Sequence, residues 1–161
     1  MKNVINFLIL FCICFSNACN RHVDREDCHF TIAFVNNSRK SVYVRQAGYS
    51  DTLYIKDFSY TPKAPNNMYK VIEGQINTKV LKLRRCYEAD FQYGDLKRLM
   101  IFVFDAEIVE NTPWEIVSKD YLVLKRYDVT LEDLQRLDWK ITYPPTEAMK
   151  DMKMWPPYGS E

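Results

Sequence analysis

Apolar and polar residues alternate along much of the chain after residue 27, with the two-residue period of β-strands. Residues 28–35 form the first such segment, with Ile32 and Phe34 on its apolar side. The turn residues 36–38 follow and residues 41–45 alternate again, so we expect these two strands to form a hairpin. Further segments of this kind predict strands at residues 52–55, 69–72, 79–83, 86–91, 121–127 and 139–143.

The segment from Leu99 to Phe104 is apolar without interruption, which is typical of a central strand buried on both faces. Two helix starts are also visible. Residues 112–115 predict a capping box with a proline at the first helical position and a short helix through Ser118. Residues 130–133 predict a second helix, whose buried side carries Leu131, Leu134 and Leu137. In the strand at residues 121–127 we expect Leu122 and Leu124 to face inward.

Seven to nine short strands with one or two short helices in their connections favour a single all-β domain. We predict a β-sandwich over residues 28–145, immunoglobulin-like or transthyretin-like. The C-terminal tail, residues 146–161, contains three methionines and a tryptophan. The sequence pattern leaves open whether this tail packs on the domain.

The first residues have the pattern of an export signal. A positively charged start at Lys2 precedes the apolar run from Val4 to Phe15, and small or polar residues follow up to Ala18. This run is shorter than the roughly 20 apolar residues that span a bilayer as a helix. We therefore predict a signal peptide at residues 1–18 and a polar tether at residues 19–27.

Cleavage before Cys19 resembles the processing of bacterial lipoproteins. Ala18 and Cys19 fit that pattern, whereas Ser16 and Asn17 depart from it and leave simple secretion open. Acylation of Cys19 would anchor the chain, because two or more acyl chains hold a protein firmly on a membrane. The expected partner is thus the membrane, through lipid on Cys19. The expected location is the cell envelope, at the outer membrane, on its periplasmic or its outer face.

The chain has five cysteines, of which Cys12 and Cys14 lie in the signal and Cys19 is the lipidation site. Cys28 and Cys86 remain, and an oxidising compartment favours a disulfide between them. It would close a loop of about 58 residues and stabilise the fold by about 4 kcal/mol. In an uninterrupted strand Cys86 would share a face with basic residues, so the bridge requires a turn near residues 84–85. Two separate buried thiols are the alternative.

The charge balance argues against nucleic acid as a partner. Loss of Lys2 with the signal leaves 21 basic and 21 acidic side chains, so the mature chain carries almost no net charge. We interpret the short basic clusters at residues 84–85 and 125–126 as solvated strand ends. His22 in the tether and His29 on the first strand lie far from any acidic cluster, so we expect no catalytic site, metal ion or cofactor.

Two groups of residues could still carry a function. Asp105, Glu107 and Glu110 follow the central strand, where paired carboxylates could hydrolyse a glycoside. We favour a simple acidic helix start instead. The connection at residues 47–67 is rich in aromatic rings that could stack on sugars, and these rings could also just cover one end of the sandwich. Its candidate ligand-binding residues are Tyr49, Tyr54, Phe58 and Tyr60.

Several segments resemble a family of lipoproteins of Bacteroides-type gut bacteria. The strongest is YDVTLEDLQRL at 127–137 followed by DWKITYPP at 138–145. CHFTI at 28–32, MIFVFD at 100–105 and TPWE at 112–115 fit as well, so the resemblance covers most of residues 28–157. It implies export and lipid anchoring and transfers no catalytic residue.

These observations lead to one expected function and two alternatives. We expect a non-catalytic, lipid-anchored binding module for glycan or protein that uses the 47–67 connection. The first alternative is a structural or assembly partner of an outer-membrane complex. The second is a hydrolase that uses Asp105 and Glu107.

Overall fold

The computed structural model describes residues 24–49 and 68–160. The predicted signal peptide, the predicted lipidation site Cys19, His22, the predicted strand at residues 52–55 and three of the four candidate aromatic residues lie outside these ranges. The three are Tyr54, Phe58 and Tyr60. Of Tyr49, only the backbone is described.

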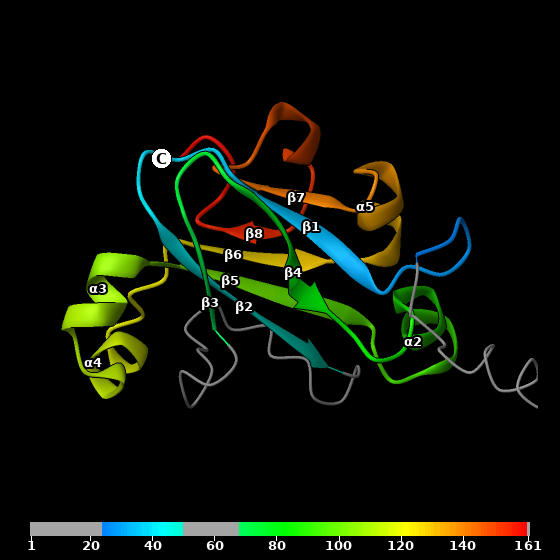
Figure 1. Ribbon diagram of the computed structural model, residues 1–161, viewed down its shortest axis with the longest axis horizontal. Helices are drawn as coiled ribbons and strands as arrows, with labels where there is room; N and C mark the ends of the chain where they lie inside the picture. Colours follow the sequence, from blue (N-terminus) through cyan, green and yellow to red (C-terminus); the bar gives the residue numbers. More distant parts are fainter. Residues whose placement is uncertain (1–23, 50–67, 161) are drawn as a thin grey trace, which may run out of the picture.

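The described strands form two sheets that pack face to face, as the sequence predicts for a sandwich (Figure 1). In the three-stranded sheet the order is β4 (Ile76–Lys82), β1 (Thr31–Asn36) and β7 (Lys140–Tyr143). In the five-stranded sheet the order is β3 (Tyr69–Val71), β2 (Val42–Tyr49), β5 (Arg98–Asp105), β6 (Lys125–Val129) and β8 (Met154–Trp155). The all-β, sandwich-like fold class is therefore confirmed.

The strand β5 is buried on both faces, as its unbroken apolar sequence predicts. Leu99, Ile101 and Val103 face the main core between the sheets. Met100 and Phe104, on the opposite side, belong to a second apolar cluster. Burial of one such side chain stabilises the fold by about 1.5–3 kcal/mol. This strand is also the central one of the five-stranded sheet.

The predicted hairpin of the first two strands is wrong. Strand β1 pairs antiparallel with β4 and parallel with β7, whereas β2 pairs with β3 and β5 in the other sheet. Alternation sets which side chains face inward, and Ile32 and Val44 are indeed both buried in the main core. The alternation does not determine which strand becomes the hydrogen-bonding neighbour. Residues 37–41 therefore cross from one sheet to the other.

The predicted strand at residues 86–91 is also wrong, because residues 87–93 form the helix α2 (Tyr87–Tyr93). Tyr87 and Phe91 are its buried residues, four positions apart as one helix face requires. Gly94 ends the helix, where a Cβ atom would come within 2.7 Å of the carbonyl oxygen of Asp90. The chain bends at Arg84 and Arg85, just before the helix, where a bridge between the cysteines requires a turn or bulge.

The described residues contain more helices than the one or two expected. Helix α3 (Ala106–Asn111) was not predicted, and helix α4 (Trp114–Lys119) was. Pro113 stands at the N-cap of α4 without a side-chain hydrogen bond, so the capping box predicted there does not form. The capping box of helix α5 (Leu131–Arg136) does form, between Thr130 and Asp133.

The strand predicted at residues 121–127 is shorter than expected, because β6 starts only at Lys125. Tyr121 has a positive φ of 50°, which keeps this stretch out of a regular strand. Leu122 is consequently 36% exposed rather than inward-facing, while Leu124 packs partly against the main core.

The described part of the C-terminal tail packs on the domain. It contains a 3₁₀ turn (Glu147–Met149) and strand β8, which pairs antiparallel with β6. Met149, Met152 and Met154 are buried in the main core. Within the described ranges, no helix is long and apolar enough to cross a membrane.

Candidate functional site

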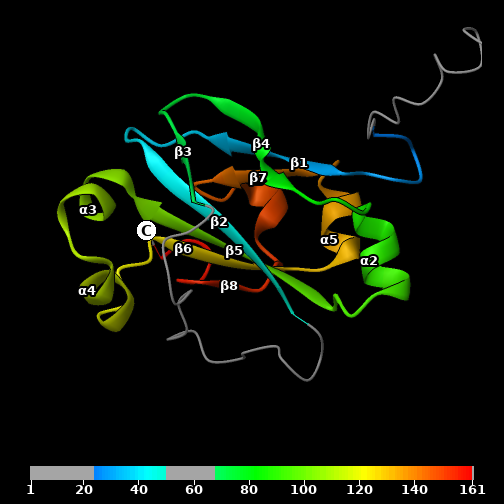
Figure 2. The same cartoon turned by 60° about the horizontal axis from the view of Figure 1, so that its bottom comes forward.

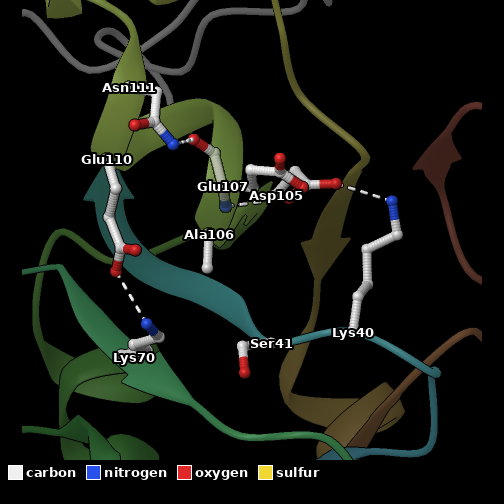
Figure 3. Close-up of a pocket in the computed structure, with 8 residues that line it drawn as sticks. All are labelled: Lys40, Ser41, Lys70, Asp105, Ala106, Glu107, Glu110 and Asn111. Carbon is white, nitrogen blue, oxygen red and sulfur yellow. Dashed lines mark hydrogen bonds and ion pairs between the residues drawn. The ribbon is translucent and has the colours of Figure 1, made fainter.

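An open pocket of about 320 Å³ lies beside helix α3 (Figure 3). Its walls come from the β1–β2 connection, from strand β3, and from the end of β5 with the following helix. The lining residues are Lys40, Ser41, Lys70, Asp105, Ala106, Glu107, Glu110 and Asn111. Seven of these eight side chains are polar or charged, so the pocket suits a hydrophilic ligand.

Two ion pairs stand on opposite sides of the pocket (Figure 3). On one side the ammonium of Lys40 lies 2.6 Å from Asp105 Oδ2. On the other side the ammonium of Lys70 lies 2.7 Å from Glu110 Oε1. The hydroxyl of Tyr43 also donates to Glu110 Oε1, at 3.2 Å. Tyr43 and Lys70 are direct cross-strand partners, which explains why both reach the same carboxylate.

The strand-to-helix junction after β5 sets the position of Asp105. Its side chain caps helix α3 by accepting a hydrogen bond from the backbone N–H of Glu107 at 3.0 Å. The backbone N–H of Ala106 donates to the carbonyl of Ser41 at 3.2 Å. The first residues of the helix are thus fixed to the β1–β2 connection at the base of the pocket.

A buried asparagine organises the other side. The amide nitrogen of Asn36 donates to the carbonyls of Lys40, at 2.8 Å, and Val71, at 3.0 Å. Its oxygen accepts hydrogen bonds from the N–H and hydroxyl of Ser38. Asn36 therefore holds together the two segments that carry Lys40 and Lys70, and we regard it as a positioning residue of the pocket.

The ion pairs keep both carboxylates ionised. Burial alone would raise the pKa of Asp105, but Lys40 and the N–H of Glu107 hold that pKa below its ordinary value. The hydrogen bond from Lys70 lowers the pKa of Glu110, and the same contact raises the pKa of Lys70. The general acid of a glycosidase needs a raised pKa, so Asp105 is not suited to that role.

Several hydrogen-bonding groups of the pocket remain for a ligand. Each ammonium has three N–H donors and uses one on its carboxylate. Among the described residues, Glu110 Oε2 and the side-chain oxygens of Ser41 and Asn111 take part in no hydrogen bond. The pocket therefore offers donors and acceptors side by side.

The pocket and the start of the described chain lie at opposite ends of the sandwich (Figures 1 and 2). Asp24 accepts hydrogen bonds from Phe30 and Thr31, at the start of β1. Lys40 follows the end of the same strand. Six residues of strand extend over about 20 Å. The pocket accordingly points away from the end at which the N-terminal segment enters the domain.

The sequence singled out only part of this site. The acidic residues Asp105, Glu107 and Glu110 do come together in the pocket. The two lysines were missed, because no local motif links them to carboxylates 65 and 40 positions away. The candidate residue Tyr49 lies elsewhere: its backbone pairs with Arg98, at the opposite end of β5.

A second cluster surrounds the two cysteines. Cys28 and Cys86 are both free thiols of intermediate exposure. The side chain of Cys86 hydrogen-bonds the Cys28 thiol, and this contact raises the pKa of Cys28 to about 11. The side chain of His29 is partly buried here: its ring stacks on Trp139 at 4.0 Å, and Nδ1 lies 2.5 Å from Glu88 Oε1.

In the described ranges, 24–49 and 68–160, no three His, Cys, Asp or Glu side chains are placed together so that they could hold a metal ion.

Comparison of the chain with protein-family models, with curated protein sequences and with solved structures found no significant match.

Proposed function

We propose that this protein is a non-catalytic, glycan-binding module of the cell envelope, anchored through lipid on Cys19. The ligand lies in the pocket between Lys40 and Lys70. The observation that carries the proposal is the mixture of unused donors and acceptors between the two ion pairs. A sugar hydroxyl both donates and accepts, so a polyhydroxylated ligand can use both kinds of group at once.

The charges of the pocket support a ligand without net charge. Two lysines face three carboxylates, and four of these five groups are already paired with each other. Such a site has no excess of positive charge for a phosphate. It also lacks the strongly acidic surface that a polycation would require.

The ion pair between Lys70 and Glu110 can rearrange at little cost. Both side chains are a little over 40% exposed, and exposed pairs of this kind contribute little to stability because water screens them. A ligand hydroxyl can therefore displace one of their contacts without destabilising the fold.

The position of the pocket supports binding at a membrane surface. A chain tethered through Cys19 would meet the membrane on the side where Asp24 enters the domain. The pocket lies at the opposite end, so a tethered domain would present it away from the bilayer (Figure 1).

A glycan array probed with the full-length chain in mild detergent tests this function. We expect reproducible binding that is reduced at least tenfold by Lys70→Ala and by Glu110→Gln. Lys150→Ala is the matched control, because Lys150 forms a similar exposed pair with Glu147 outside the pocket. An array without hits, or hits that both pocket variants retain in full, would refute the proposal.

A second candidate function is assembly with an outer-membrane complex. Ile108 on α3 and Ile116 on α4 are 39% and 44% exposed, and both helices lie at the end of the molecule that carries the pocket. Exposed apolar residues of this kind can contact another protein. A stable companion that co-purifies with the wild-type chain in mild detergent, and is lost in Ile116→Glu, would favour this alternative.

A further inference from the structure

Cys28 and Cys86 lie where two segments of the chain run side by side. The backbone N–H of Tyr87 donates to the carbonyl of His29 at 2.8 Å, and that of Leu83 donates to Phe30 at 3.0 Å. These two contacts bring the start of β1 against the start of α2. The cysteines stand one residue before His29 and one residue before Tyr87.

Hydrogen bonds hold the backbone at Cys28, while its thiol stays partly exposed. Its backbone exchanges two hydrogen bonds with Arg25, at 3.0 and 3.2 Å. The carboxylate of Glu88 accepts from the backbone N–H of His29 at 2.8 Å and binds its ring. Both thiols keep intermediate exposure, so a small reagent or another protein can reach them.

We propose that Cys28 and Cys86 form a redox-modification site, which an external disulfide oxidises within the folded domain. The number of cysteines alone suggests a pair. The structure shows in addition that the two side chains are already in contact and that backbone hydrogen bonds hold the segments around them. The bond can therefore form without a change of the fold. It would fasten the segment leading from the N-terminal tether to helix α2.

The reaction is a thiol–disulfide exchange with two steps. One of the two thiols loses its proton and its sulfur attacks the donor disulfide, which forms a mixed disulfide and releases one donor thiol. The other cysteine then loses its proton, and its sulfur attacks the first cysteine's sulfur and releases the second donor thiol. Two electrons and two protons pass from the pair to the donor disulfide, which is fully reduced.

The test uses the full-length chain, reduced in mild detergent and then treated with glutathione disulfide. Trypsin places Cys28 in the peptide 26–39, Cys86 in 86–97, and the three remaining cysteines in 3–21. We expect mass spectrometry to find 26–39 linked to 86–97. Exclusive addition of glutathione to separate thiols, without this link, would overturn the proposal.

Two single variants, Cys28→Ser and Cys86→Ser, test the exchange. We expect each to keep glutathione on its remaining cysteine as a stable mixed disulfide, because the second thiol that would release it is missing. A single variant that takes up no glutathione, or one that releases it again without added thiol, would overturn the proposal.

Discussion

Arg126 and Asp128 are both fully buried in strand β6 and bind each other through two hydrogen bonds. Arg126 Nε lies 2.6 Å from Asp128 Oδ1, and the guanidinium also lies 5.7 Å from the centre of the Phe102 ring. We had interpreted residues 125–126 as a solvated strand end, and that interpretation is wrong, since Lys125 is buried as well. Composition alone cannot distinguish a buried arginine from an exposed one, because its burial depends on a partner.

Removal of the buried carboxylate should destabilise the fold strongly. Asp128→Ala leaves Arg126 as a buried charge without its main partner, which costs about 3–5 kcal/mol. Urea denaturation followed by circular dichroism measures this loss. Glu147→Gln is the matched control, because Glu147 pairs with Lys150 at an exposed site and should contribute less than about 1 kcal/mol. Equal stabilities of the two variants would contradict the role of the pair.

Asp105 makes stability depend on pH in the acid range. The pKa of Asp105 in the folded state is lower than the ordinary value of 3.8, so its ionised carboxylate stabilises the fold fully at pH values above 3.8. The contribution is lost as the pH falls through the lower, folded-state pKa. Asp105→Asn keeps a helix cap but removes the charge. We expect its melting temperature to lie below that of the wild type at pH 7 and to converge with it near pH 2. A difference in melting temperature between the two chains that is independent of pH would contradict this account.

At the scale of elements, signals confined to four or five residues predict only some helix starts, since the capping box expected before α4 does not form, and longer-range choices are not predictable from them. The capping box of α5 forms as predicted, because Thr130 and Asp133 need only each other. The segment 86–91 was predicted as a strand, and positions i and i+4 share a face in both a strand and a helix. Only contacts outside the segment decide between the two, such as the one from Tyr87 to the carbonyl of His29.

Helix α5 provides a direct test of its cap. Thr130 accepts a hydrogen bond from the N–H of Asp133 at 3.1 Å, so Thr130→Ala should cost about 1 kcal/mol of unfolding free energy. Thr146→Ala is the matched control, because Thr146 precedes a 3₁₀ turn without making a side-chain cap. Chemical denaturation of both variants measures the difference. Equal losses of unfolding free energy in the two variants would show that the capping hydrogen bond of Thr130 does not stabilise the fold.

For the whole molecule, the sequence predicts the class of fold but not the assembly of the pocket. Alternation places the core residues of the strands, and two sheets are needed to cover them. Which strands pair depends on non-local contacts, such as the parallel pairing of Ala33 with Lys140. The pocket depends on the same contacts, since Lys40 and Asp105 come from different connections. Of the site, therefore, only the acidic residues after β5 could be found in advance.

The proposed anchor is a property of the whole molecule and has its own test. We expect the wild-type chain to stay in the membrane fraction of a bacterial host and Cys19→Ala to move to the soluble fraction, because the acyl chains supply the membrane affinity. Cys86→Ser, which keeps Cys19, should remain with the membranes. A Cys19→Ala chain that also remains there would contradict lipid anchoring at this residue.

Hydrogen exchange of the full-length chain, with and without a glycan that it retains on the array, tests the central claim most directly. We expect the glycan to slow exchange in residues 36–43, 69–71 and 105–111, the three segments that build the pocket. Slower exchange confined to the aromatic connection at residues 47–67 would contradict the pocket as the binding site. A chain that retains no glycan would contradict the glycan-binding function itself.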